Sequence, residues 1–221
     1  PPDYAYGRPG FKTGLRSIHE AWHAKRADLL TTSQSITEAL QTETQRLTTV
    51  PLTRETLQTA VAQLSAQYDS VHGGFGPAPK FPRPHALSFL LRMWYRDRDP
   101  EVLQMVEATL QAMARGGIHD HLGGGFHRYS TDERWLVPHF EKMLYDQALL
   151  ALAYLEAFQV TGSPDYAQVA RGLFTYVLRD LRDPDGAFYA AEDAGEVGSE
   201  GAFYLWTPAQ VETALGAEEA S

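Results

Sequence analysis

The chain has 221 residues, with 19 lysine and arginine residues against 28 aspartate and glutamate residues, and it contains no cysteine. The net charge of −9 argues against nucleic acid and anionic membrane surfaces as main partners. The lack of cysteine excludes disulfides, thiolate zinc sites and cysteine nucleophiles from this chain, whose length suits one large domain or two small ones.

The sequence contains no apolar run of roughly 18 residues, the length of a transmembrane helix, and no signal-peptide pattern. We therefore expect a cytoplasmic protein without nucleic-acid or membrane partners. A start at Pro1 and Pro2, with no initiator methionine, indicates a chain cut from a longer protein.

Helices are predicted over most of the chain. Apolar residues recur at helical spacing over 11–47, which we interpret as one long or broken helix that Pro51 ends. Further helices are indicated where a proline or a capping residue precedes an apolar stripe, and their starts lie near Thr53, Pro84, Asp99, Pro138, Pro164 and Thr207. In the helix expected after Pro138, His139, Lys142 and Asp146 would share one face.

Three long loops rich in glycine and aromatic residues separate these helices, over 72–84, 118–138 and 183–207. The Gly-Gly-Phe sequence that ends at Phe75 recurs at Phe126, at a distance typical of repeated helical hairpins. In the third loop, the segments 186–189 and 201–204 are predicted to pair as a small hairpin. The sequence therefore predicts an all-α array of helical hairpins with a small β-hairpin in a loop, whose long loops meet around one cleft.

The second loop and its end carry the densest group of reactive side chains. Histidine and carboxylate side chains perform general acid–base catalysis, and paired carboxylates suit glycoside or proton-transfer chemistry. The candidate catalytic residues are accordingly His119, His121, His127, His139 and Glu141, together with Glu192 and Asp193 of the third loop. The structural alternative is that the histidines bond loop carbonyls and that ion pairs support a helix N-terminus.

Aromatic and charged residues of the first two loops and the following helix are expected to bind substrate by stacking and hydrogen bonding. They are Phe75, Lys80, Arg128, Trp135, Lys142 and Asp146. For Phe75 and Phe81, the alternative is that the rings plug the hairpin ends. No metal or cofactor is predicted, since His119-Asp120-His121 has no clear third zinc ligand.

One short motif points to a different class of protein. His19-Glu20-Ala21-Trp22-His23 matches the pattern in which two helical histidines bind zinc and the glutamate acts as a base, and Glu43 follows at a plausible third-ligand distance. Against a zinc metalloprotease, Trp22 belongs to the apolar stripe and so short a pattern arises easily by chance. The alternative is an exposed helix face with two histidines.

Three longer segments carry a resemblance to a known family. GGFGPAPKFPRP, DHLGGGFHRYSTDERWLVPHFEKMLYDQALL, and DGAFYAAEDA with EGAFYLWT are similar to the thioredoxin-domain-containing, spermatogenesis-associated (YyaL-like) family. The start, PPDYAYGRPGFKTGL, resembles the end of that family's thioredoxin-like domain. The resemblance implies that residues 1–10 end such a domain and that residues 11–221 form part of an (α/α)6 toroid, similar to six-hairpin glycosidases and N-acylglucosamine 2-epimerases.

Together, the motifs and the resemblance predict a carbohydrate-active or sugar-binding helical domain with glycosidase- or epimerase-like acid–base chemistry and a carbohydrate ligand. The competing hypothesis is a non-catalytic interaction scaffold that kept the toroid and lost the chemistry. An enzyme requires that at least two of the named side chains converge within hydrogen-bond reach in a concave pocket. A partial ring is also expected to expose apolar hairpin faces and to self-associate.

Overall fold

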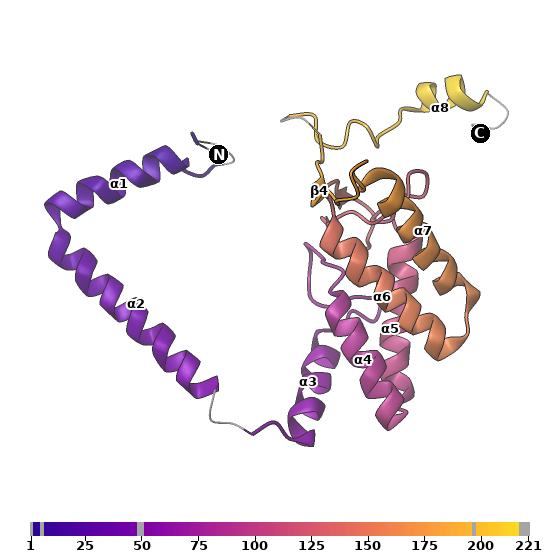
Figure 1. Cartoon of the computed structure of the whole chain (residues 1–221), viewed down its shortest axis with the longest axis horizontal. Helices are drawn as coiled ribbons and strands as arrows, with labels where there is room; N and C mark the ends of the chain where they lie inside the picture. The colour runs from indigo at the N-terminus through magenta and orange to yellow at the C-terminus, as the bar shows by residue number, and fades with distance from the viewer. Residues whose placement is uncertain (1, 5–6, 48–50, 196–197, 217–221) are drawn as a thin grey trace. The chain divides into compact units, whose positions relative to one another are not determined.

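The structure, a computed structural model, describes residues 2–4, 7–47, 51–195 and 198–216, without the side chains of 45–47. The chain is mostly helical and divides into two compact units, Pro1–Arg54 and Glu55–Ser221 (Figure 1). The division falls well after residue 10, and the assignment of residues 1–10 to a preceding thioredoxin-like domain stays a prediction. None of the described helices has the length and apolar character required to cross a membrane.

The first unit contains the predicted broken helix. α1 (Phe11–Ala24) and α2 (Arg26–Leu47) are separated at Lys25, whose backbone leaves the helical region at φ −141° and ψ 40°. No residue of α1 is buried within the described part of the chain, and its apolar stripe, including Trp22, is exposed.

The second unit is built from helices whose starts match the predicted caps, except for the helix expected after Pro138. The Asp99 side chain accepts a hydrogen bond from the N–H of Glu101, and Thr207 forms a capping box with Gln210. The helices are α3 (Arg54–Gln67), α4 (Pro84–Asp97), α5 (Pro100–Arg115), α6 (Leu144–Thr161), α7 (Pro164–Asp180) and α8 (Pro208–Leu215).

Helical hairpins pack around one core in this unit. Short turns join α4 to α5 and α6 to α7 at one end, and the long loops lie at the other end (Figure 1). Leu87, Leu110 and Leu150 are fully buried between the helices, and the Tyr154 hydroxyl donates to the carbonyl of Leu110 at 2.8 Å. Because the loops share one end, their side chains can converge there.

Apolar side chains remain exposed along α6 and α7. Leu149, Leu152, Phe174 and Leu178 each expose at least 40% of their surface. The expected exposed apolar hairpin faces are therefore present, and self-association through them stays a prediction.

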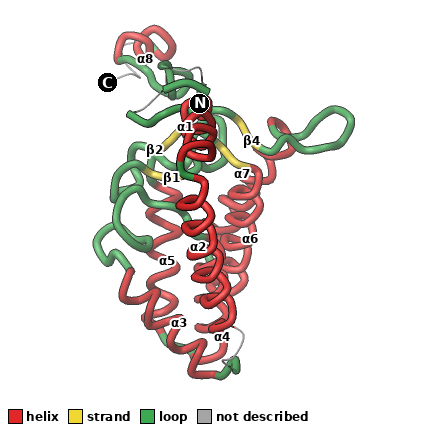
Figure 2. The backbone as a smooth tube through the Cα atoms, turned by 90° about the vertical axis from the view of Figure 1, so that its left-hand side faces the viewer, coloured by secondary structure: helices red, strands yellow, loops and turns green. Residues whose placement is uncertain are grey.

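Within the described ranges, four two-residue strands lie at the loop end (Figure 2). β1 (Tyr129–Ser130) pairs with β2 (Pro138–His139), and β3 (Lys142–Met143) pairs with β4 (Ala191–Glu192), both antiparallel. The second loop thereby joins the third, and the bridge from Lys80 to Ser130 joins it to the first. The predicted pairing of 186–189 with 201–204 is wrong, because Phe188 pairs with Arg182 at the end of α7 and 201–204 forms turns.

The helix expected directly after Pro138 is also wrong, since α6 begins only at Leu144. Residues 138–143 are extended because they form ladder bonds on both sides, with β1 at one end and β4 at the other. Successive side chains of an extended segment point to opposite sides, whereas a helix would gather residues three and four apart. His139, Lys142 and Asp146 therefore do not share one face.

The long loops after α3, α5 and α7 repeat one hydrogen-bonded turn. Asp69, Asp120 and Asp183 each donate their backbone N–H to a carbonyl five or four residues later, and each Oδ1 accepts backbone N–H groups of the turn. A bridge to Phe75, Phe126 or Phe188 closes each turn. This threefold pattern confirms the predicted hairpin repeat.

Candidate acid–base site

The extended segment 138–143 distributes the predicted site residues to two sides. His139 and Glu141 contact Arg128, Tyr129 and Glu200, whereas Phe140 and Lys142 contact Tyr204. We call Arg128, His139, Glu141 and Asp146 the acid–base cluster.

The acid–base cluster brings together residues of the second loop and the start of α6. The Glu141 carboxylate lies 2.6 Å from Nη1 of Arg128 and 3.1 Å from Nε2 of His139. The other ring nitrogen of His139, Nδ1, bonds Glu200 of the third loop. Two of the predicted catalytic side chains are thus within hydrogen-bond reach, which meets the first of the two conditions for an enzyme.

Asp146 lies in the first turn of α6 and is 7% exposed, and its Oδ2 has no hydrogen-bond partner among the described residues. Burial raises the pKa of Asp146 to about 6, against a weaker lowering by Arg128. Burial alone would also raise the pKa of Glu141, but the hydrogen bond from Arg128 and the nearby His139 lower it overall. Two carboxyl groups with divergent pKa values suit the roles of acid and base.

An aromatic stack leads from the first loop to the acid–base cluster. The ring centroids of Phe81 and Tyr129 are 4.8 Å apart, and those of Tyr129 and His139 are 4.9 Å apart. Phe81 is 44% exposed, so a ligand can reach the outer end of this stack. Aromatic faces next to charged groups suit a ligand with both apolar and hydroxyl surfaces.

Three of the predicted catalytic histidines bond backbone carbonyls. Nδ1 of His119 lies 3.1 Å from the Ala114 carbonyl, and Nε2 of His121 lies 3.1 Å from that of Gly116. His127 is buried, with Nδ1 3.0 Å from the Phe140 carbonyl, and burial and the charge of Lys142 lower its pKa to about 4. These contacts match the structural alternative for the three residues and place them outside the cluster.

Three predicted substrate-binding residues of the first two loops lie in the core. Phe75 is 2% exposed and packs on Tyr68, and Trp135 is fully buried with its Nε1 donating to the His72 carbonyl at 3.1 Å. Lys80 is 1% exposed, with Nζ on Asp69 at 2.5 Å and on two carbonyls at 2.8 Å. None of the three offers a free group to a ligand in this structure.

Lys142 and Glu192 line a separate pocket of about 540 Å³ on the other side of the segment. Nζ of Lys142 lies 2.7 Å from Asp120, and the Glu192 carboxylate accepts hydrogen bonds from Tyr176 and Tyr204, both at 2.7 Å. Asp193 is exposed, and its Oδ1 accepts the N–H of Ala194. The three predicted carboxylates are thus separated: Glu141 lies in the acid–base cluster, Glu192 lines this pocket and Asp193 is exposed to solvent.

Sequence reasoning missed Tyr129, Tyr176, Tyr204, Asp120 and Glu200. For Asp120, a signal was available, because it stands at the same place before its glycines as Asp69 does in the first loop. The tyrosines and Glu200 belong to the sites through contacts between segments that are distant in the sequence, and a sequence pattern does not show such contacts.

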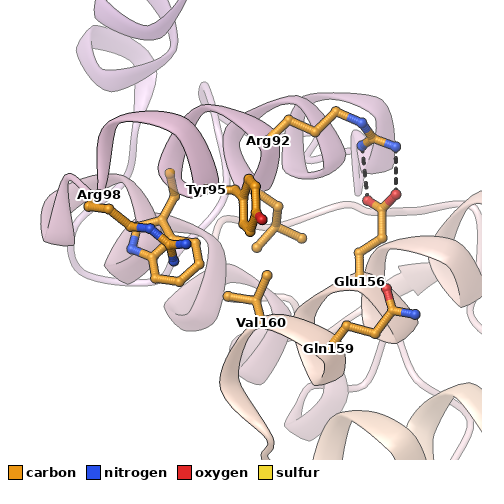
Figure 3. A pocket seen from close by; sticks show the side chains of 8 residues that line it. Arg92, Tyr95, Arg98, Glu156, Gln159 and Val160 are labelled. Carbon is orange, nitrogen blue, oxygen red and sulfur yellow. Dashed lines mark hydrogen bonds and ion pairs between the residues drawn. The ribbon is translucent and has the colours of Figure 1, made fainter.

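Another pocket, of about 420 Å³, lies between α4 and α6 (Figure 3). Arg92 and Glu156 form a two-point ion pair at one end of it, and Arg98 covers the rings of Trp94 and Tyr95. No predicted site residue lines this pocket, so it does not belong to the candidate site.

The histidines of the protease-like motif lie on α1. Their ring centroids are 4.5 Å apart, and His19 and His23 are both exposed. Among the described residues, no group of three or more histidine, aspartate or glutamate side chains is placed to hold a metal ion. The pair therefore has no third ligand in this part of the chain.

The raised pKa of Asp146 gives a testable stability effect. Since its folded pKa of about 6 exceeds the ordinary value of 3.8, ionisation costs free energy in the folded state as pH rises from about 4 to 6. We expect Asp146→Asn to raise the free energy of unfolding by up to about 3 kcal/mol at pH 8 and by almost nothing at pH 4. Urea unfolding at both pH values measures this difference.

Asp193→Asn is the matched control for Asp146→Asn, because Asp193 is exposed. The lowered pKa of His127 makes unfolding easier as pH falls through the same range, but it does so equally in both variants. An equal effect of Asp146→Asn at pH 4 and pH 8 would contradict an ionised, buried Asp146.

Known proteins with a related sequence are longer than this chain, which matches only part of their length. No protein-family model matches the chain. Human spermatogenesis-associated protein 20 is 45% identical over 238 residues, which cover 99% of this chain and 30% of the human protein. The mouse protein of the same name is 43% identical over 229 residues, covering 97% of this chain and 29% of its own length. The chain thus spans less than a third of these curated relatives.

Solved structures share the fold. Cellobiose 2-epimerase from Bacillus thermoamylovorans B4167 matches 67% of this chain and 44% of its own, with a TM-score of 0.55 and 16% identity. A sugar epimerase from a ruminal bacterium matches 75% of this chain and 51% of its own, with a TM-score of 0.56 and 16% identity. At this identity the likeness shows the fold alone, a partial helical toroid.

Proposed function

We propose that this chain, a homologue of spermatogenesis-associated protein 20 with the fold of part of a sugar epimerase, binds a carbohydrate and performs acid–base chemistry on it at the acid–base cluster. The observation that carries the proposal is the pair of carboxyl groups beside Arg128, of which Glu141 has a lowered and Asp146 a raised pKa. A purely structural ion-pair network gains nothing from a buried carboxyl group whose Oδ2 has no hydrogen-bond partner among the described residues.

The cluster suits proton transfer at the carbon next to a sugar carbonyl. Glu141, ionised at neutral pH, takes the proton, and the charge that develops on the carbonyl oxygen is stabilised by the guanidinium of Arg128. Asp146 in its protonated form returns a proton to the carbon, so that charge and atoms balance. The exposed Phe81 ring, at the outer end of the aromatic stack, offers a stacking face for the ring of a second sugar unit.

Glu141→Gln tests the role of the base. It keeps the size of the side chain and removes the charge, so we expect exchange of the sugar C2 proton with solvent deuterium to slow by about 10²-fold or more. The measurement is proton NMR of reducing mono- and disaccharides with the 221-residue chain, after a thermal-shift screen selects those that bind.

Asp193→Asn serves as the control, since this carboxylate is exposed and outside the cluster. Exchange that stays unchanged in Glu141→Gln, or that falls equally in Asp193→Asn, would rule out the cluster as the site. Absence of both binding and exchange for all sugars would overturn the proposal.

A non-catalytic scaffold is the second candidate function. The carbonyl contacts of His119, His121 and His127 favour it, because each of them explains a histidine without chemistry. The two candidates predict different results. For a scaffold, Glu141→Gln changes the stability of the protein, and neither the chain nor the variant binds a sugar or exchanges its C2 proton faster than buffer does.

A further inference from the structure

The pocket on the Lys142 side of segment 138–143 is separate from the acid–base cluster and has its own charge pattern. Its charged residues include Asp120, Lys142, Arg179, Asp180 and Glu192. Lys142 pairs with Asp120, and Arg179 pairs with Asp180, so these four charges cancel. Glu192 forms no ion pair with any described residue, which leaves the pocket with one uncompensated negative charge.

The two hydrogen bonds on Glu192 hold its carboxylate in place without neutralising it. Tyr176 and Tyr204 donate to its two oxygens at 2.7 Å each. Burial first, and then the hydrogen bond to Glu192, raises the pKa of both phenols, so they stay protonated donors and Glu192 stays the acceptor. Each carboxylate oxygen retains a lone pair for a further donor.

The chain contains an internal comparison for this pocket. Lys80 is held by Asp69 and the Gly73 carbonyl, just as Lys142 is held by Asp120 and the Gly124 carbonyl. Nζ of Lys80 lies 5.5 Å from the fully buried ring of Trp135, and Nζ of Lys142 lies 4.6 Å from the ring of Tyr176 and 5.1 Å from that of Tyr204. Both lysines are buried by the same turn, and Lys142 also lines the open space of about 540 Å³.

Two exposed aromatic side chains stand at the rim. Phe203 is 83% exposed and Tyr189 is 50% exposed, and both line the pocket. A fixed carboxylate at the wall with aromatic faces at the entrance complements a ligand with a positive nitrogen at one end and an apolar body at the other.

We propose that this pocket binds a small organic ammonium ion, with the Glu192 carboxylate as its charge partner. The ammonium group donates to the two Glu192 oxygens, and the body of the ligand lies against Phe203 and Tyr189. The site faces away from the acid–base cluster and does not rest on the carbohydrate function proposed for that cluster.

A pair of probes that differ in one group tests the charge requirement. Tyramine carries an ammonium group where 4-(2-hydroxyethyl)phenol carries a hydroxyl, and the two are otherwise alike. By isothermal titration with the 221-residue chain at pH 7, we expect tyramine to bind at least about tenfold more tightly than the alcohol. Equal binding of the two, or binding of neither, would overturn the proposal.

Variants then locate the site. Glu192→Gln is expected to weaken tyramine binding by about tenfold or more and to leave the alcohol unaffected, whereas Glu141→Gln, in the acid–base cluster, leaves both unchanged. Phe203→Ala changes a side chain that is 83% exposed, and it is expected to weaken tyramine binding several-fold even where Glu192→Gln lowers stability. Tyramine binding that both pocket variants leave intact would place the ligand elsewhere and contradict the proposal.

Discussion

Replacing Lys80 by methionine is expected to lower the free energy of unfolding by about 3–5 kcal/mol. The change removes three hydrogen bonds of a side chain that is 1% exposed, and it leaves the Asp69 carboxylate without its cation. Burial alone would raise the pKa of Asp69, but the bonds from Lys80 and from two backbone N–H groups lower it overall, so the carboxylate stays ionised at neutral pH. Urea unfolding of the 221-residue chain at pH 7 gives the free energy.

Arg92→Met is the matched control for Lys80→Met. The Arg92 side chain is 65% exposed, and its ion pair with Glu156 is expected to contribute no more than about 1 kcal/mol. The double variant Lys80→Met with Asp69→Asn should recover part of the loss, because no unpaired charge then remains. A loss in Lys80→Met as small as in Arg92→Met would show that the buried network does not stabilise the loop.

Gly125→Ala is expected to destabilise the protein by about 3 kcal/mol. The backbone of Gly125 has φ +81°, and an added Cβ would lie 2.6 Å from the ring of Tyr176. That ring cannot move away easily, since it is 1% exposed and its hydroxyl bonds Glu192. The backbone strain at Gly125 and the steric overlap with Tyr176 therefore both contribute to the loss of stability. The loss is read as a shift of the urea midpoint at constant slope.

Gly162 separates the two contributions. It has a similar φ of +73°, but an added Cβ would meet nothing within 4 Å, so Gly162→Ala carries the backbone strain alone, about 1 kcal/mol. If both alanine variants lose the same free energy, the close approach of Tyr176 to Gly125 contributes nothing, and the packing described for this loop is wrong.

The helices were predictable because their signals are local. Pro84, Asp99 and Thr207 mark helix starts through their own backbone preferences and caps, within a few residues of the helix that they begin. Segment 138–143 misled the same reasoning, since its extended form depends on pairing with Tyr129 and Ala191, which lie outside any local window.

The sequence indicated most residue types of the candidate site, but it did not indicate which of these residues contact one another. His139 does meet Glu141, which in turn meets Arg128, because residues two apart in an extended segment share a side. For Trp135, the sequence offers an aromatic side chain in a loop, which suits a ligand as well as a core. Only the contact of its ring nitrogen with the His72 carbonyl, 63 residues away, decides for the core.

The repeated turn has a consequence for the order in which the chain assembles. The bonds that close the turns at Asp69, Asp120 and Asp183 join residues four or five positions apart, and such short closures lose little chain entropy. Contacts such as that of Trp135 with His72 join distant residues and must wait for the hairpins to meet. We therefore expect each turn to form early within its own loop. The long-range contacts then stabilise turns that have already formed.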